Sequence, residues 1–144
     1  MERATAPSQV PALPRNRLLV AEDDRALREL MVQILRSDGH EVLAVANGND
    51  LLYTLEGSLN PRTGVAPFDL VISDVRMPGQ SGLNAFAQVG YGPQMPPVVF
   101  MTAFGDEDVH QRAIHLGAIA VLDKPVDFDE LRVFVKSYLA HGHG

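Results

Sequence analysis

The chain has 144 residues, 46% of them hydrophobic and 21% charged, a balance that is typical of soluble globular domains and excludes disordered and fibrous classes. This length leaves room for one domain rather than two. A formal net charge of -6 argues against direct nucleic-acid binding, which needs a basic face. No apolar run approaches the roughly 18 residues that span a bilayer. The absence of cysteine excludes a disulfide framework and is typical of a reducing compartment, so we expect a cytoplasmic protein.

Composition divides the chain into three stretches. Residues 1–15 contain prolines but no apolar block, which predicts a flexible leader rather than a secretory signal. Residues 16–140 hold the patterned segments of one domain, and residues 141–144 form a short tail. The sequence is therefore either a complete single-domain protein or a fragment.

After the leader, short apolar runs alternate with segments of helical period, which is typical of an α/β fold with a parallel sheet. The predicted strands are Arg17 to Ala21, Glu41 to Val45, Leu70 to Ser73, Val98 to Thr102, and Ala120 to Asp123. The first helix is predicted from Leu27, Leu30, Met31, Ile34 and Leu35, with Asp24 as its N-cap. Later helices are predicted at Asp50 to Glu56, Leu83 to Val89, Asp106 to Leu116, and Phe128 to Ala140, with an irregular loop from Gly57 to Pro67.

Polar residues follow four of the five predicted strands, at the edge where open parallel sheets bind ligands. They are Glu22-Asp23-Asp24 after the first strand, Asp74 after the third, Thr102 at the end of the fourth, and Asp123-Lys124-Pro125 at the end of the fifth. The second strand ends in uncharged, turn-like residues, as expected of an edge strand. A strand order of 2-1-3-4-5 would place the first and third strands side by side at this edge.

Three carboxylates meeting at that edge, from Glu22, Asp23 and Asp74, repel one another unless positive charge joins them. Lys124 supplies one positive charge, and a divalent cation supplies more. A small set of oxygen ligands, with water completing an octahedron, favours Mg2+ over Ca2+. A metal, a carboxylate, a hydroxyl and an ammonium group together suit phosphoryl transfer to a carboxylate.

Four motifs stand in order along the chain: Leu18-Leu19-Val20-Ala21-Glu22-Asp23-Asp24, Val71-Ile72-Ser73-Asp74-Val75-Arg76-Met77-Pro78-Gly79-Gln80-Ser81-Gly82, Val98-Val99-Phe100-Met101-Thr102-Ala103, and Leu122-Asp123-Lys124-Pro125. Together they resemble the receiver domain of two-component response regulators of the chemotaxis-regulator type, over Asn16 to Leu139. The resemblance implies a doubly wound α/β fold, with a five-stranded parallel sheet in the flavodoxin-like order 2-1-3-4-5 and five helices.

The same resemblance implies the metal and acceptor roles. Asp74 accepts a phosphoryl group from a sensor histidine kinase or a histidine phosphotransfer protein. Asp23 binds Mg2+ directly, Glu22 acts mainly through water, and Arg76 contributes its backbone carbonyl. A receiver of this kind is a signalling switch rather than an enzyme, limited to Mg2+-dependent self-phosphorylation and autodephosphorylation. Its output partner is not visible in the sequence, and a homodimer through the face of the fourth and fifth strands is a candidate assembly.

The phosphoryl group has its own predicted contacts. By resemblance, Thr102 and the adjacent Ala103 bind it and report its presence, and Lys124 pairs with Asp74 or with the phosphoryl oxygens. The bond between Lys124 and Pro125 is expected to be cis, which costs little only before proline.

Three positions depart from or modulate the family pattern. Val121 stands where many receivers carry a Tyr or Phe that turns inward on activation, so that ring movement cannot operate here. Arg76 and Phe104 occupy positions whose side chains flank the path of the hydrolytic water in this family. We expect Phe104 to take over part of the missing ring's role, moving with Thr102, or else to shield the acyl phosphate from water.

Three other functions compete with this interpretation. A phosphohydrolase of the haloacid dehalogenase type needs a second Asp two positions after the nucleophile, where Arg76 stands and cannot act as the general acid. A flavodoxin-like nucleotide binder is disfavoured because Glu22, Asp23 and Asp24 repel phosphate. A receiver-like docking module that is never phosphorylated stays open as the main alternative.

Overall fold

One five-stranded parallel sheet forms the centre of the molecule. A computed structural model describes residues 15–90, 94–103 and 106–141. The strand order is β2-β1-β3-β4-β5, so the predicted doubly wound order is confirmed. The strands are β1 (Arg17–Ala21), β2 (Glu41–Val45), β3 (Leu70–Asp74), β4 (Val98–Ala103) and β5 (Ala120–Lys124). The helices are α1 (Arg25–Ser37), α2 (Gly48–Leu59), the short η3 (Pro61–Thr63), α3 (Gly82–Val89), α4 (Glu107–His115) and α5 (Phe128–Ala140).

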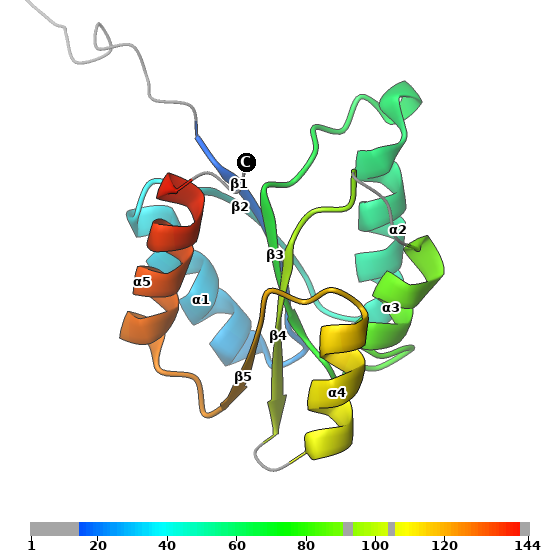
Figure 1. The fold of residues 1–144 in the computed structure, drawn as a ribbon. Coiled ribbons are helices and arrows are strands. Elements are labelled where there is room, and N and C mark those ends of the chain that lie inside the picture. The colour runs from blue at the N-terminus through cyan, green and yellow to red at the C-terminus, as the bar shows by residue number, and fades with distance from the viewer. Residues whose placement is uncertain (1–14, 91–93, 104–105, 142–144) are drawn as a thin grey trace, which may run out of the picture.

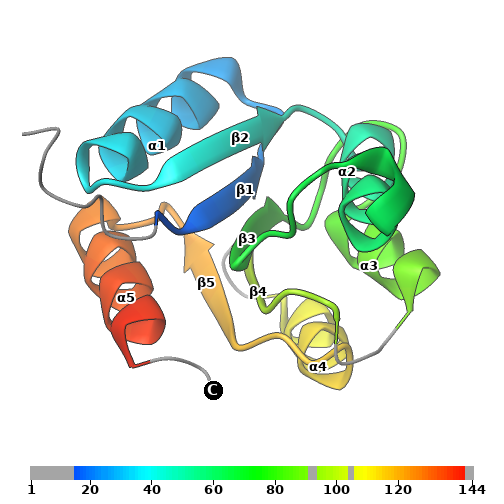
Figure 2. The ribbon, with the colours of Figure 1, turned by 90° about the horizontal axis from the view of Figure 1, so that it is seen from above.

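The helices form a layer on each side of the sheet. Helices α1 and α5 cover one face, and α2, α3 and α4 cover the other, as the view along the sheet in Figure 2 shows. Parallel strands need such crossover helices, which is why both faces of the sheet are buried.

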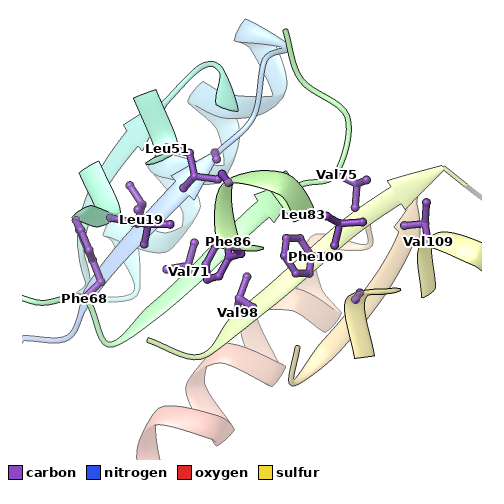
Figure 3. Packing of buried hydrophobic residues seen from close by; sticks show 14 residues of the cluster. Leu19, Leu51, Phe68, Val71, Val75, Leu83, Phe86, Val98, Phe100 and Val109 are labelled. Atoms are coloured by element: carbon purple, nitrogen blue, oxygen red, sulfur yellow. The ribbon is translucent and has the colours of Figure 1, made fainter. Parts of the chain in front are cut away.

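Side chains along each strand point alternately to the two faces of the sheet, so each strand contributes to a hydrophobic core on both faces. Leu18 and Val20 of β1 point to the core under α1 and α5, whereas Leu19 and Ala21 point to the core under α2, α3 and α4. Figure 3 shows the second of these cores, where Phe100 is fully buried. Its ring meets that of Phe86 edge to face, with 5.5 Å between the ring centroids.

Helix boundaries follow their capping residues. Asp24 accepts a hydrogen bond from the backbone N–H of Leu27, so the predicted cap of the first helix is confirmed. Asp127 caps α5 in the same way and accepts the backbone N–H groups of Asp129 and Glu130. Helix α2 is longer than predicted, because Asn47 caps it from outside and its interior accommodates Gly57. The predicted irregular loop from Gly57 to Pro67 is therefore wrong at its start: it begins after Leu59, and η3 lies within it.

Strand register aligns the functional edge of the sheet. Ala21 of β1 pairs with Ser73 of β3, and Thr102 of β4 pairs with Asp123 of β5. The residues that follow these positions consequently emerge at the same edge of the sheet, which the arrowhead of β4 marks in Figure 1. This edge is where the predicted site residues meet.

Candidate functional site

The site is centred on Asp74, the last residue of β3. Its side chain is nearly buried, with 7% of its surface exposed. Glu22 follows β1 directly and its side chain is completely buried, while the neighbouring Asp23 is exposed. The structure therefore brings the three predicted carboxylates together, with Asp23 on the solvent side.

Lys124 links two of these carboxylates. Its Nζ donates hydrogen bonds to Asp74 Oδ2 at 2.8 Å and to Glu22 Oε1 at 3.0 Å. The lysine ends β5, and the peptide bond to Pro125 is cis, as the resemblance implied. One ammonium group thus serves two carboxylates, which leaves the cluster with a net negative charge.

Burial and charge shift the protonation of this cluster. Burial raises the pKa of the Glu22 carboxyl to about 7, against hydrogen bonds from the Asp24 backbone N–H and from Lys124 that lower it. The nearby charge of Asp74 raises the pKa of Glu22 further. Burial lowers the pKa of Lys124, but its hydrogen bonds to Asp74 and Glu22 outweigh this effect and raise the pKa above its ordinary value.

The three carboxylates also fit a divalent cation. One oxygen each from Glu22, Asp23 and Asp74 lies within 4.8 Å of the other two. Hard carboxylate oxygens at this spacing, with an open side for water, suit Mg2+. A cation would also offset the negative charge that Lys124 leaves unbalanced.

Thr102 carries a hydroxyl without a partner. The residue is 1% exposed, and no group in the described part of the chain forms a hydrogen bond with Oγ1. A buried polar atom of this kind normally has a partner. Ala103, the next residue, is exposed at the end of β4, and Val121 is partly buried against the core under α4.

The Arg76 side chain pairs with the residue that caps α4. The guanidinium is exposed and donates from Nη2 to Asp106 Oδ2 at 3.0 Å. Asp106 is the N-cap of α4 and accepts the backbone N–H of Val109 through its other oxygen. Phe104, for which a switching or shielding role is predicted, lies outside the described residues.

The loop after β3 is held by contacts that sequence reasoning missed. The Gly82 N–H donates to Val75 O at 2.8 Å, and a Cβ on Gly82 would lie 2.4 Å from Asp74 O and 2.5 Å from Ser73 Oγ. The buried Ser73 hydroxyl in turn donates to Asp74 O at 2.9 Å. Gly82, which ends the second motif, is therefore needed for this close approach, and its place in the motif could have indicated so.

Arg28 is a second residue that sequence reasoning missed. It lies in the first turns of α1, and its Nη1 donates to the backbone oxygen of Glu22 at 2.9 Å and to that of Asp23 at 3.4 Å. Its spacing of four residues from the Asp24 cap places it over the acidic loop, but many surface arginines share such a spacing.

Comparison with known proteins identifies the class of protein. Residues 18–136 match the family model of the response regulator receiver domain. This chain belongs to that family of two-component signalling domains.

Individual relatives show the same relationship. The chain is 34% identical over 120 residues to the transcriptional regulatory protein PdtaR of Mycobacterium tuberculosis, covering 83% of this chain and 54% of that protein. It is 31% identical over 123 residues to sporulation initiation phosphotransferase F of Bacillus subtilis, covering 85% of this chain and 93% of that protein. The chain thus spans about half the length of PdtaR but nearly the full length of the Bacillus protein.

Solved structures share the fold. A response regulator receiver domain protein from Clostridium thermocellum superposes with a TM-score of 0.72 at 26% identity, covering 85% of this chain and 92% of that one. A CheY-like receiver domain protein from Methanospirillum hungatei gives a TM-score of 0.76 at 23% identity, covering 89% and 96%. Among the described residues, no helix combines the length and apolar character that crossing a membrane requires.

Proposed function

We propose that this chain is a phosphorylation-controlled signalling switch in which Asp74 accepts a phosphoryl group from a sensor histidine kinase or a histidine phosphotransfer protein. Phosphorylation requires Mg2+ held by Asp23, Asp74 and the backbone carbonyl of Arg76, with Glu22 acting mainly through water. The receiver domain at residues 16–140 carries this site, between a leader at residues 1–15 and a tail at residues 141–144.

One observation carries the proposal: an ammonium group lies against the Asp74 carboxylate, and a buried hydroxyl without a partner among the described residues lies at the end of the neighbouring strand β4. Lys124 Nζ lies 2.8 Å from Asp74 Oδ2. Thr102 Oγ1 is buried without a hydrogen-bond partner in the described part of the chain. A structural aspartate needs neither of these neighbours, whereas a phosphoryl group attached to Asp74 would give both of them oxygens to bind.

The transfer step is a substitution at phosphorus. An Asp74 carboxylate oxygen forms the new P–O bond, and the P–N bond of the donor phosphohistidine breaks. The electron pair of that bond stays on the imidazole nitrogen. A donor ring that is protonated at its other nitrogen leaves as neutral imidazole, and an unprotonated ring takes up one proton from solvent to become neutral imidazole. Because little other covalent chemistry is involved, catalysis consists of positioning and charge stabilisation.

Each neighbour has one task in this step. Lys124 balances the charge that develops on the phosphoryl oxygens, and the Thr102 hydroxyl with the Ala103 backbone binds one of those oxygens. When bound, Mg2+ neutralises charge on the incoming phosphoryl group and on the carboxylates. With Val121 in place of an aromatic ring, the signal passes through Thr102 toward α4 rather than through a ring on β5.

The protein is a receiver rather than an enzyme with an external substrate. Its reactions are limited to self-phosphorylation and autodephosphorylation, whose rate Arg76 and Phe104 modulate. The chain acts in the cytoplasm, where its partners are a sensor histidine kinase or a histidine phosphotransfer protein and an output partner or domain. The face formed by β4 and β5 is a candidate for pairing with a second copy. The acidic composition argues against direct contact with nucleic acid.

Phosphorylation by a small-molecule donor tests the proposal. The full chain is incubated with acetyl phosphate and Mg2+, and intact-protein mass spectrometry follows one added phosphoryl group. We expect modification that Asp74→Asn abolishes and that the exposed Asp108→Asn retains. We also expect the group to be lost in alkali, as an acyl phosphate is.

Two results would contradict the proposal. Stoichiometric phosphate on Asp74→Asn would show that another residue is the acceptor. A wild-type chain that binds beryllofluoride and Mg2+ but takes no phosphate from acetyl phosphate or from phosphohistidine donors would instead indicate a docking module.

A further inference from the structure

The loop between β1 and α1 holds its two acidic residues in different ways. The Glu22 side chain is fixed at both oxygens, by the Asp24 backbone N–H at 3.0 Å and by Lys124 at 3.0 Å. The Asp23 carboxylate is exposed, and no described residue forms a hydrogen bond with it. The position of that carboxylate therefore depends on how the backbone of Asp23 is held.

Arg28 provides a side-chain contact to that backbone. Its Nη1 is shared between the carbonyl oxygens of Glu22 and Asp23, at 2.9 and 3.4 Å. A charged donor that bridges successive carbonyls fixes the orientation of both peptide planes. The two carbonyl oxygens that Arg28 binds belong to the residues whose carboxylates lie at the site, each with one oxygen within 4.8 Å of one oxygen of Asp74.

The position of Arg28 is also specific among the cations of this helix. Arg25 lies one turn earlier on α1, is largely exposed, and pairs with Glu29 of the same helix at 2.9 Å. It therefore supplies a similar charge without touching the acidic loop. The chain thus offers a matched control for the charge of Arg28.

We propose that Arg28 is a positioning residue for the metal site, which orders the Asp23 backbone so that its carboxylate is presented to Mg2+. This inference deepens the proposed function and rests on the magnesium site that it contains. Residues behind a ligand commonly contribute to metal affinity by orienting it. The positive charge of Arg28 opposes cation binding, so the proposal requires that loop order outweigh this repulsion.

The inference is tested by titrating the phosphate-free full chain with Mg2+. The backbone amide signals of residues 22–28 in NMR spectra report the binding. We expect Arg28→Ala to raise the Kd for Mg2+ on the order of tenfold, and Arg25→Ala to leave it within twofold. Arg28→Lys should recover part of the loss, because one ammonium keeps the charge but lacks the planar fork of the guanidinium. Thermal unfolding of each variant without Mg2+ separates a weakened site from a weakened fold.

A thermodynamic cycle sharpens the test. If Arg28 acts through Asp23, adding Arg28→Ala to Asp23→Asn should change the Mg2+ affinity by less than twofold, whereas a general structural role would add its full effect. The phosphorylation rate of Arg28→Ala should recover at saturating Mg2+, because the reacting groups are untouched.

Three results with a folded Arg28→Ala variant would overturn the inference: an unchanged or tighter Kd for Mg2+, an equal loss of affinity in Arg25→Ala, or full additivity with Asp23→Asn. If Arg28→Ala does not fold, Arg28→Lys takes its place. An Mg2+ affinity of a folded Arg28→Lys equal to that of the wild type or to that of Asp23→Asn would then overturn the inference. If Asp23→Asn itself leaves Mg2+ binding unchanged, the magnesium site of the proposed function fails together with the role of Arg28. If only Arg28→Ala is silent, the proposed function stands and this inference alone is wrong.

Discussion

Replacement of Asp74 by Asn changes the balance of charge at the edge of the sheet while preserving its shape. The Asn side chain has the same size, and its carbonyl oxygen can accept the Lys124 hydrogen bond that Asp74 Oδ2 now accepts at 2.8 Å. Its amide can donate to the carboxylates of Glu22 and Asp23, which lie within 4.8 Å. We therefore expect the variant to fold and to be more stable than the wild type in the absence of divalent cations.

The expected change in the free energy of unfolding of Asp74→Asn is the balance of opposing electrostatic contributions. At an effective dielectric constant of about 20, the attraction between Asp74 and Lys124 at 2.8 Å is worth about 6 kcal/mol. The repulsion from the buried Glu22, at no more than 4.8 Å, is worth at least about 3.5 kcal/mol. Burying the Asp74 carboxylate costs several kcal/mol more, and a neutral Asn retains a hydrogen bond to a charged group worth about 1.5–3 kcal/mol. The net expectation is a gain of about 2 kcal/mol in the free energy of unfolding.

The gain should depend on pH with a defined sign. Since the pKa of Glu22 is raised to about 7, this carboxyl is ionised at pH 8 and repels Asp74 fully. Below pH 6 it takes up a proton, the repulsion disappears, and the advantage of the Asn variant should shrink. Mg2+ should stabilise the wild type more than the variant, because the variant has lost one metal charge.

Urea unfolding followed by far-UV circular dichroism measures these differences. Both chains are compared at pH 8 and pH 5.5 with a chelator, and at pH 8 with Mg2+, using the exposed Asp108→Asn as the control for loss of one negative charge. A variant less stable than the wild type at pH 8 in chelator would show that the Lys124 attraction dominates. A gain that is the same at both pH values would refute the assigned role of Glu22.

Three further predictions concern other parts of the molecule. Burial raises the pKa of Glu22 from its ordinary 4.5 to about 7 in the folded chain. The folded chain therefore binds more protons than the unfolded chain between these pH values, and the contribution of Glu22 to stability should fall by up to about 3 kcal/mol as the pH rises from 4.5 to 7. In chelator, Glu22→Gln should remove this slope. Gly82→Ala should lower the free energy of unfolding by more than about 2 kcal/mol, because its Cβ would lie 2.4 Å from Asp74 O. Gly57→Ala, whose Cβ would have nothing within 4 Å, should raise the free energy of unfolding by about 0.5–1 kcal/mol through its higher helix propensity. Urea unfolding measures both variants, and equal effects would contradict the packing argument. Phe100→Ala should cost about 3–5 kcal/mol in the same assay, since the ring is fully buried against Phe86, and a loss below 1 kcal/mol would mean that the core collapses around it.

Elements with strong local patterns were predictable from sequence. The spacing of Leu27, Met31 and Leu35 defined α1, and α5 was predicted with its observed bounds because Asp127 provides a cap and an amphipathic run follows. Helix α2 was predicted too short, since a glycine was taken as a breaker. Gly57 is accommodated because Leu51 and Leu55 are buried in the core, and this packing outweighs its low helix propensity.

The residues that form the site could also be predicted from the sequence. Parallel strands carry their carboxyl ends to one edge, so Glu22, Asp23, Asp74, Thr102 and Lys124 were expected to meet once their strands were recognised. The cis bond before Pro125 followed from the resemblance to receiver domains.

Only the tertiary structure decided how these groups differ from one another. Glu22 and Asp23 are adjacent acidic residues with the same local signal, yet one is buried against Lys124 and the other faces solvent. The contact of Arg28 with their carbonyl oxygens likewise leaves no distinctive mark in the sequence. Secondary structure and strand ends follow from interactions over a few residues, whereas burial, ion pairing and pKa depend on which distant segments pack around a group, and only the assembled sheet and helices determine that.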